Sequence, residues 1–416
     1  MKIGKYSFGV GDRFGREGEA QLNALLKARE KGCRITPVWN KSHREHSIVG
    51  TSPADVRAEA ERATEARNWE DEYYVDADHI SRENVDGFLA SSDFFTLDVA
   101  DYIGEAPAQE DIDKFLGENR HLLGKIALPM LNREIELSEP RFRKIAEKYL
   151  VAANRAGELY EYITDNKGSE DFITEVSMDE TDQPQTPDEL LLILKALSDM
   201  DIPVQTIAPK FSGSFYKGID YIGDTEAFKK EFQADLAVIL HAKDEFGLPS
   251  NLKLSVHSGS DKFSLYPIMR EALMSFDTGL HLKTAGTTWL EELIGLALSG
   301  KEALSIAAEI NVQALERREE LCSPYASVID IDPSKLPSAD DVRNWSGETY
   351  ANALRHAPSS PSYNPHLRQL LHVAYKVAAE MGERYLEALE ENCDVVGENV
   401  TENLLERHIE PLFPPQ

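Results

Sequence analysis

Short runs of apolar and β-branched residues recur along the chain, and each is followed by a polar turn and a stretch with helical spacing. After the first run, Leu22, Leu25 and Leu26 have the i, i+3, i+4 spacing of an amphipathic helix over 18–31. Alternating strands and helices form a parallel sheet with right-handed crossovers. Eight such units predict closure into an α/β fold of the (β/α)8 type, and an open doubly wound sheet is the alternative. The eight runs are SFGVG (7–11), ITPVWN (35–40), YYVDAD (73–78), FFTLDVA (94–100), FITEVS (172–177), VQTIAP (204–209), LKLSVH (252–257) and GLHLKT (279–284).

Two helix starts carry side-chain signals. Thr186 and Glu189 have the spacing of a capping box, and Pro187 suits the first helical position, so a helix is predicted over 187–199. Thr288 and Glu291 repeat the box without proline and predict a second helix start after the eighth run.

Two segments fall outside the repeating unit. Residues 102–171 contain helical patterns at about 109–122 and 138–164, which predicts a helical insertion after the fourth strand. Residues 301–416 are mostly helical, with HAPSSPSYNP (356–365) as a loop. We therefore predict a barrel domain over 1–300 and a C-terminal extension over 301–416. The extension is expected to pack on the barrel mouth, where catalytic loops of such barrels lie.

Composition narrows the functional classes. The net charge of −29 leaves no basic field for nucleic acid or for an anionic membrane. Three scattered cysteines and the lack of an apolar run of about 18 residues predict a cytoplasmic protein without disulfides or a membrane span. A homo-oligomer stays open, and we expect no nucleotide cofactor.

Polar residues occupy one register of most strand runs. Because side chains alternate along a strand, that register faces the barrel interior. Buried unpaired charges cost several kcal/mol each, so such groups must pair or bind a ligand. Any single member can be a satisfied polar residue of the barrel wall, but the set predicts a shared polar cavity. Its members are Asp76, Asp78, Thr96, Asp98, Glu175, Ser177, Gln205, Lys253, Ser255, His257, His281 and Lys283, with Asp179 and Lys210 just past two strand ends.

Imidazoles and carboxylates near these strand ends suit a divalent metal ion. The predicted ligands are His79, Glu175, His257 and His281. They fit zinc, manganese, cobalt or nickel, although they come from separate strands and form no compact HxxxH or CxxC motif. Carboxylates crowded around one cavity have pKa values pushed apart, which permits proton transfer in both directions. The predicted catalytic residues are Asp78, Glu175 and Lys283; Asp179 and Glu180 are further acids or a solvated loop.

Two loops have the composition of an anion site. SVHSGSDKF (255–263) and KTAGTTWLEE (283–292) place glycine and hydroxyl residues directly after strands, where backbone N–H groups can bind a carboxylate or phosphate. Tight turns use the same residues, so this alternative stays open. Cations near other strand ends would offset the repulsion between an acidic chain and an anionic substrate. The predicted substrate-binding residues are Arg13, Lys210, Ser258, Gly259, Lys262 and Thr287.

Long blocks of the chain resemble the tagaturonate/fructuronate epimerase family of bacterial hexuronate breakdown. The blocks are KYSFGVGDRFG, ITPVWNKSHREH, YVDADHI, SDFFTLDVAD, DFITEVSMDET, QTIAPKF, LKLSVHSGSDKFS, GLHLKTAGTTWLEE, YNPHLRQLLHVAYK and VTENLLERHI. The resemblance implies a metal-dependent epimerase that acts on a small anionic sugar acid. The reaction that the resemblance implies is the interconversion of D-tagaturonate and D-fructuronate by inversion of carbon 4.

The substrate's structure favours a retro-aldol route. The ketone lies at carbon 2, so it does not acidify the proton on carbon 4. Deprotonation of the carbon-4 hydroxyl with cleavage of the C3–C4 bond would give an aldehyde and an enediolate, and a Lewis-acid metal stabilises the latter. An aldose–ketose isomerase or an aldolase on the same barrel, and a non-catalytic sugar-acid binder, are the alternatives.

A second resemblance, to class II aldolases, agrees with this route. Asp78-His79 after an early strand and His257 followed by SGS match that pattern, with the aspartate as acid/base and the histidines as zinc ligands. The sixth strand lacks the expected histidine, so His281 or Glu175 would replace it.

Overall fold

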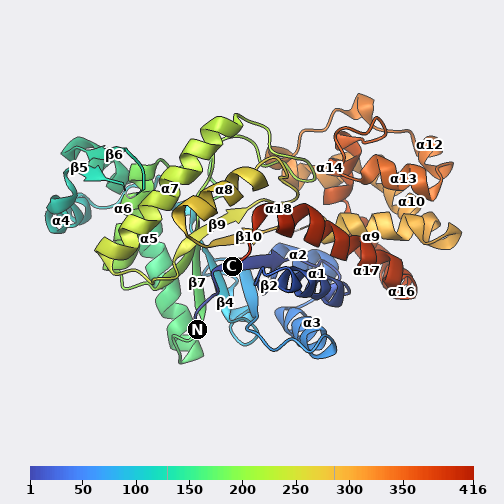
Figure 1. Ribbon diagram of the computed structural model, residues 1–416, viewed down its shortest axis with the longest axis horizontal. Helices are drawn as coiled ribbons and strands as arrows, with labels where there is room; N and C mark the ends of the chain where they lie inside the picture. Colours follow the sequence, from blue (N-terminus) through green and yellow to red (C-terminus); the bar gives the residue numbers. More distant parts are fainter. Residues whose placement is uncertain (129, 285) are drawn as a thin grey trace.

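The computed structural model describes residues 1–128, 130–284 and 286–416. Within these residues, eight parallel strands close into a barrel in the order β1-β2-β3-β4-β7-β8-β9-β10, which confirms the predicted fold class (Figure 1). Each predicted run begins and ends within two residues of its strand. The barrel strands are β1 (Tyr6–Val10), β2 (Thr36–Ser42), β3 (Tyr74–Ile80), β4 (Phe94–Asp98), β7 (Ile173–Ser177), β8 (Val204–Ala208), β9 (Lys253–His257) and β10 (Leu280–Lys283).

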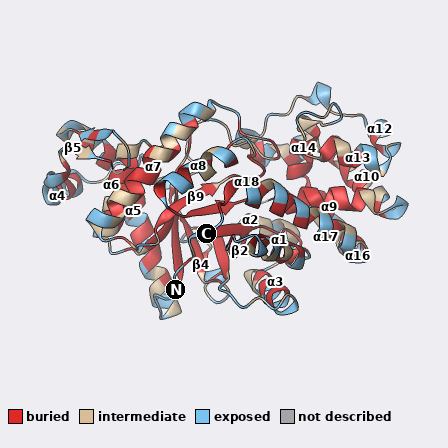
Figure 2. Cartoon of the chain, in the orientation of Figure 1, coloured by how far each residue is buried: buried red, intermediate tan, exposed pale blue. Residues whose placement is uncertain are grey.

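Helices connect the strands and cover the outside of the barrel, so the strands lie at the buried centre (Figure 2). Among the described residues they are α1 (Gly18–Glu30), α2 (His43–Val49), α3 (Pro53–Ala66), α4 (Gln109–Glu118), α5 (Glu139–Lys167), α6 (Pro187–Asp199), α7 (Thr225–Phe246), α8 (Tyr266–Phe276) and α9 (Thr287–Leu298). Short 3-10 turns lie at η1 (Val85–Gly87), η2 (Ala100–Tyr102), η3 (Arg120–Leu122), η4 (Ser323–Val328) and η5 (Pro333–Lys335).

Of the two predicted capping boxes, one forms. Thr186 precedes α6 and its backbone N–H donates to the Glu189 carboxylate at 3.0 Å. The box predicted at Thr288 is wrong, because α9 begins at Thr287 without a side-chain cap. There the Thr288 hydroxyl accepts from Gln21 and the Glu291 carboxylate accepts from Asn403, each at 3.0 Å. Both side chains of the motif therefore make tertiary hydrogen bonds and do not cap the helix.

The insertion after β4 contains more than the two helices predicted. The helices α4 and α5 form, but between them lies an antiparallel hairpin of β5 (Gly124–Ala127) and β6 (Glu134–Leu137). Its strands are only four residues long. Most residues of β5 are exposed and show no hydrophobic pattern, and β6 alternates over just four residues. The long helix α5 packs against β4 and α6, and thereby serves as the barrel helix of this unit.

The C-terminal part of the chain forms a group of helices beside the barrel, and its last helices pack on the barrel's outer helices. Its helices are α10 (Lys301–Glu316), α11 (Arg318–Cys322), α12 (Ala339–Arg343), α13 (Gly347–Leu354), α14 (Pro365–Val373), α15 (Tyr375–Met381), α16 (Glu383–Glu391), α17 (Cys393–Glu402), the π-helical η6 (Asn403–Ile409) and α18 (Glu410–Leu412). Two hydrophobic clusters result. One combines α9 with helices α10 to α16, and the other combines the barrel with residues near the end of the chain.

The end of the chain covers the outer face of the first strand. The Phe413 ring lies 5.2 Å from that of Tyr6 and 6.4 Å from that of Phe8. The helix η6 packs against α1, and α18 packs against α8, as Figure 1 also shows. The helix that follows β10 therefore leaves the barrel, and a segment more than 100 residues later takes its place beside β1.

A buried carboxylate joins the C-terminal region to the loop after β9. Asp261 Oδ2 accepts from Arg368 Nη2 at 2.6 Å and lies 3.0 Å from His356 Nδ1, while Oδ1 lies 3.2 Å from His408 Nε2. Thr287 Oγ1 donates to the same carboxylate at 3.2 Å. Burial opposes ionisation, but Arg368 and the two histidines hold the pKa of Asp261 well below its usual range. The C-terminal residues are thus tied to loops at the carboxyl ends of β9 and β10.

Replacing the buried arginine of this cluster should destabilise the protein strongly. Arg368→Met leaves the Asp261 charge without its main partner and also removes hydrogen bonds to the carbonyls of Gly218 and Leu354. We expect a loss of about 3–5 kcal/mol in the free energy of unfolding, measured by urea denaturation. The control is Arg343→Met, which removes a half-exposed pair with Asp340 and should change stability by less than about 0.5 kcal/mol. Equal losses in the two variants would contradict this assignment.

Candidate active site at the barrel mouth

One ammonium group lies at the centre of a buried set of acids. Lys283 Nζ is 2.6 Å from Asp76 Oδ2, 2.8 Å from Asp78 Oδ1 and 3.0 Å from Glu175 Oε1. It also lies 2.6 Å from Thr96 Oγ1, which donates to Asp76 at 2.9 Å. These residues come from β3, β4, β7 and β10, so four strands of the barrel deliver them to one point. Period-two alternation predicted this convergence.

The acids of this cluster differ widely in pKa. Burial, with the neighbouring charges of Asp78 and Glu175, raises the pKa of Asp76 to about 7 against the opposing effect of Lys283. Burial also disfavours the charged form of Asp78, but Lys283 outweighs it and lowers that pKa to about 2. Against burial, the pKa of Glu175 likewise falls well below its usual range, and the carboxylates raise that of Lys283 well above its own. Near neutral pH, Asp76 is the acid of this set that can hold a proton.

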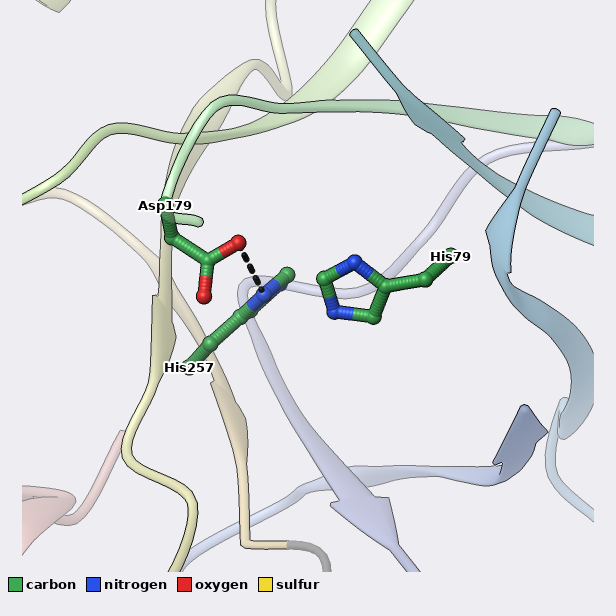
Figure 3. Close-up of side chains that lie close together, drawn as sticks. All are labelled: His79, Asp179 and His257. Atoms are coloured by element: carbon green, nitrogen blue, oxygen red, sulfur yellow. Dashed lines mark ion pairs between the residues drawn. The ribbon is translucent and has the colours of Figure 1, made fainter. Parts of the chain in front are cut away.

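Two histidines and an aspartate form a second group beside the first. His257 Nε2 lies 2.8 Å from Glu175 Oε1, and its Nδ1 lies 3.3 Å from Asp179 Oδ1. The rings of His79 and His257 face each other edge to face with centroids 5.0 Å apart (Figure 3). Ligand atoms of His79, Asp179 and His257 all lie within 4.8 Å of one another, so this group could hold a metal ion. His79 Nδ1 is oriented by Asp98 Oδ2 at 3.2 Å.

An irregular backbone brings two consecutive residues into the same mouth. In a regular strand Asp78 and His79 would point to opposite faces. The pairing of β3 with β4 shifts between Ala77 and Ile80, and His79 has a left-handed φ of 51°. A bulge with such a residue re-aims a side chain, and a non-glycine residue in this region carries strain of order 1–3 kcal/mol. The strand thereby presents Asp78 to Lys283 and His79 to His257.

The chemistry of this second group fits a divalent cation. Burial lowers the pKa of His79, but Asp78, Asp98 and Asp179 outweigh it and raise the pKa well above its usual range. The pKa of His257 is raised to about 9, since Asp179 and Glu175 outweigh burial there too. Both shifts report a strongly negative potential at the imidazoles. Two imidazoles and a carboxylate are ligands that zinc, manganese, cobalt and nickel accept.

The structure places His281 outside this group. His281 Nδ1 lies 2.9 Å from Ser7 Oγ, and its ring centroid is 5.4 Å from that of Phe94. Burial lowers its pKa to about 3. Because His281 stands two residues before Lys283 on β10, it occupies a deeper layer of the barrel. Of the predicted ligands, His79 and His257 come together, Glu175 contacts His257, and Asp179 stands where His281 was expected.

Three of the predicted substrate-binding side chains are engaged within the protein. Lys262 Nζ donates to the carbonyls of Tyr216 and Ile219 at 3.1 and 2.9 Å. Ser258 Oγ donates to the carbonyl of Lys283 at 2.8 Å, and Thr287 Oγ1 donates to Asp261. These contacts shape the loops after β9 and β10, which is the turn chemistry left open as the alternative.

The other predicted substrate-binding residues lie around the same mouth. Arg13 is buried, with its guanidinium 3.7 Å from the Tyr375 ring centroid and Nη1 3.1 Å from Glu45 Oε1. Gly259 has a left-handed φ of 65°, and its carbonyl lies 3.1 Å from His372 Nε2. Lys210 follows β8, and its backbone N–H donates to Gln185 Oε1 at 2.6 Å. The structure therefore brings Arg13 and Gly259 together with the C-terminal region.

Sequence reasoning overlooked Asn40. This residue lies in the inward register of β2, pairs with Asp76 in the sheet, and is buried. Within the described residues, neither its Oδ1 nor its Nδ2 has a hydrogen-bond partner. A Cβ built on Gly9 would lie 3.2 Å from Asn40 Oδ1 and 3.0 Å from Lys283 Cγ, so the amide borders the lysine cluster. Period-two alternation also reaches Asn40, but its run, ITPVWN, contains no ionisable residue that would mark which register faces inward.

Comparisons with known proteins identify the family of the chain. A family model described as tagaturonate epimerase matches residues 1–412. A tagaturonate/fructuronate epimerase from Thermotoga maritima is 30% identical over 422 residues, covering 98% of this chain and 80% of that protein.

Solved structures show the same fold. The native crystal structure of fructuronate-tagaturonate epimerase from Cohnella laeviribosi matches with a TM-score of 0.78 at 24% identity, covering 98% of this chain and 82% of that one. A complex of that enzyme with two glycerols matches with a TM-score of 0.80. None of the helices formed by the described residues is long and apolar enough to cross a membrane. The family match over nearly the whole chain confirms the resemblance seen in the sequence, and the protein belongs to the tagaturonate epimerase family of isomerases.

Proposed function

We propose that this protein interconverts D-tagaturonate and D-fructuronate by inverting carbon 4, through cleavage and re-formation of the C3–C4 bond. The observation that carries the proposal is the contact between two groups at the barrel mouth. An acid–base cluster around Lys283 adjoins the His79, Asp179 and His257 group, with Glu175 touching both. A carbon–carbon cleavage needs both a proton carrier and stabilisation of a developing negative charge.

The bond changes balance without an external reductant or oxidant. A carboxylate takes the proton from the carbon-4 hydroxyl, and carbon 4 becomes an aldehyde. The electron pair of the C3–C4 bond moves to carbon 3 and onto the carbon-2 oxygen, which gives an enediolate. The aldehyde turns its other face, the bond re-forms, and the proton returns to the carbon-4 oxygen with inverted configuration.

Residues of the lysine cluster supply the proton transfer. Asp78 is ionised near neutral pH and is assigned as the proton carrier. Lys283 contacts Asp76 and Asp78 together, so a proton taken by one can be shared with the other. The pKa of Asp76, about 7, suits a group that holds and releases a proton at neutral pH.

His79, Asp179 and His257 would hold a divalent metal ion. A bound ion of this kind supplies Lewis-acid stabilisation of the negative charge on the enediolate. Asp98 orients His79, and Glu175 orients His257, as carboxylates beside metal-ligating imidazoles commonly do. Zinc, manganese, cobalt and nickel all suit this donor set.

Reaction in deuterated water tests the bond-cleavage route. Because the C4–H bond is never broken, D-tagaturonate should become D-fructuronate without deuterium at carbon 4, as measured by NMR of the product. Deuterium at carbon 4 would instead indicate a mechanism that deprotonates carbon 4 directly. Release of free three-carbon products as the main outcome would indicate an aldolase instead.

Epimerisation should depend on a metal ion, and metal binding should depend on the predicted ligands. A chelator should abolish epimerisation, and added manganese or zinc should restore it. We expect His79→Gln and His257→Gln to weaken metal binding by at least about tenfold, measured as metal content after dialysis against buffered metal. His281→Gln should retain its metal, because His281 bonds to Ser7 instead. Loss of metal in His281→Gln with retention in His79→Gln would overturn this assignment.

Loss of the proton carrier should slow turnover more than binding. Asp78→Asn keeps the size of the side chain but removes the base, so kcat for D-tagaturonate should fall on the order of 10²- to 10⁴-fold. The matched control is Asp277→Asn, which removes an exposed carboxylate. Asp277 lies just before β10, at the end of that strand opposite to Lys283. An Asp78→Asn variant with normal kcat would remove Asp78 from the mechanism.

A further inference from the structure

Three cations from different segments gather at the barrel mouth against two tyrosines of the C-terminal region. Lys217 Nζ and the Arg44 guanidinium lie 5.9 and 5.1 Å from the centroid of the Tyr325 ring. The Arg13 guanidinium lies 3.7 Å from the centroid of Tyr375, and the two tyrosine hydroxyls are 3.1 Å apart. The loops after β1 and β8 and the first turn of α2 therefore direct positive charge at one place.

Among the described residues, two of these cations lack an ionic partner. Arg13 pairs with Glu45 at 3.1 Å. Across residues 1–128, 130–284 and 286–416, the charged groups of Lys217 and Arg44 make neither an ion pair nor a hydrogen bond. Burial and the charges of Arg13 and Arg44 lower the pKa of Lys217, while Glu180 and Glu45 oppose them. Arg44 is exposed, so water can solvate it, but Lys217 is partly buried, and an anion would offset the cost of burying its charge.

These cations border the loops that carry the chemistry. A Cβ built on Gly259 would lie 3.9 Å from Lys217 Nζ, and Gly259 stands two residues after His257. A Cβ built on Gly286 would lie 2.8 Å from Arg13 Nη2, and Gly286 stands three residues after Lys283. Both glycines have left-handed φ values, 65° and 88°. An extended six-carbon substrate can therefore contact the cations at one end and the reacting groups further along.

We propose that Lys217, together with Arg44 and Arg13, binds the carboxylate of the hexuronate substrate and sets the preference for hexuronates over neutral ketohexoses. This inference rests on the proposed function. Ammonium and guanidinium groups form strong charge-assisted hydrogen bonds with carboxylates. Lys262, Ser258 and Thr287 are occupied within the protein. Carboxylate recognition therefore falls mainly to Lys217 and Arg44, with Arg13, which also pairs with Glu45, beside them.

The test compares two inhibitors that differ at one end. D-Gluconate and D-glucitol are open six-carbon polyols, and only the first has a carboxylate. With metal-loaded Lys217→Met, the inhibition constant of D-gluconate and the KM of D-tagaturonate should rise on the order of 10- to 100-fold. The inhibition constant of D-glucitol should change less than about threefold. Lys217→Arg should restore most of the D-gluconate affinity, because it returns the positive charge.

Controls separate a local contact from general effects. Lys230→Met removes an exposed lysine on α7. It tests whether the loss of one positive charge far from the site changes D-gluconate binding. Arg44→Met, at an exposed position, should weaken D-gluconate selectively and serves if Lys217→Met folds poorly. Equal weakening of both inhibitors by Lys217→Met, or no effect on either, would overturn the proposal.

Direct calorimetry keeps this inference separate from the proposed function. If the wild-type protein fails to epimerise D-tagaturonate but binds D-gluconate in a Lys217-dependent manner, the proposed function fails while the carboxylate site stands. If it epimerises D-tagaturonate and Lys217→Met leaves KM unchanged, the function stands and the carboxylate site fails.

Discussion

The ammonium group of Lys283 makes the rest of the site possible. Asp76, Asp78 and Glu175 are almost fully buried, and three carboxylates so close together would repel one another strongly in a low dielectric. One cation within 3.0 Å of each offsets part of that repulsion and the cost of removing them from water. Because the offset is incomplete, one acid is left with a pKa near neutrality while the others ionise. The same contacts that permit burial therefore create a proton-transfer system.

Glu175 couples this cluster to the histidine group. Its Oε1 lies within hydrogen-bonding distance of both Lys283 and His257. A change in charge on either side is consequently felt on the other. The strain stored at His79 adds a geometric condition, since only the left-handed backbone there turns the imidazole toward His257 while Asp78 faces Lys283. A regular strand could deliver one of these residues but not both.

Much of the fold could be predicted because each barrel strand is a short apolar run bounded by turns. The hairpin β5–β6 escaped prediction because its strands are only four residues long and because β5 shows no alternation of burial. The Thr288 box failed because a local motif cannot reveal that Gln21 and Asn403, both distant in sequence, claim its side chains. In the site, period two identified the inward register but not the depth along it. It therefore grouped His281, which bonds to Ser7 in a deeper layer, with His257 at the mouth. Period two also could not show that the Lys262 ammonium group donates to backbone carbonyls.

The position of Phe413 against Tyr6 and Phe8 has a consequence for how the chain folds during synthesis. All eight strands have emerged from the ribosome once residue 283 is free, yet the outer face of β1 still lacks its cover. Contacts between residues about 400 positions apart form slowly, because closing so long a loop loses much chain entropy. Until Phe413 packs there, the nascent barrel exposes the aromatic surface of β1, which raises its tendency to aggregate.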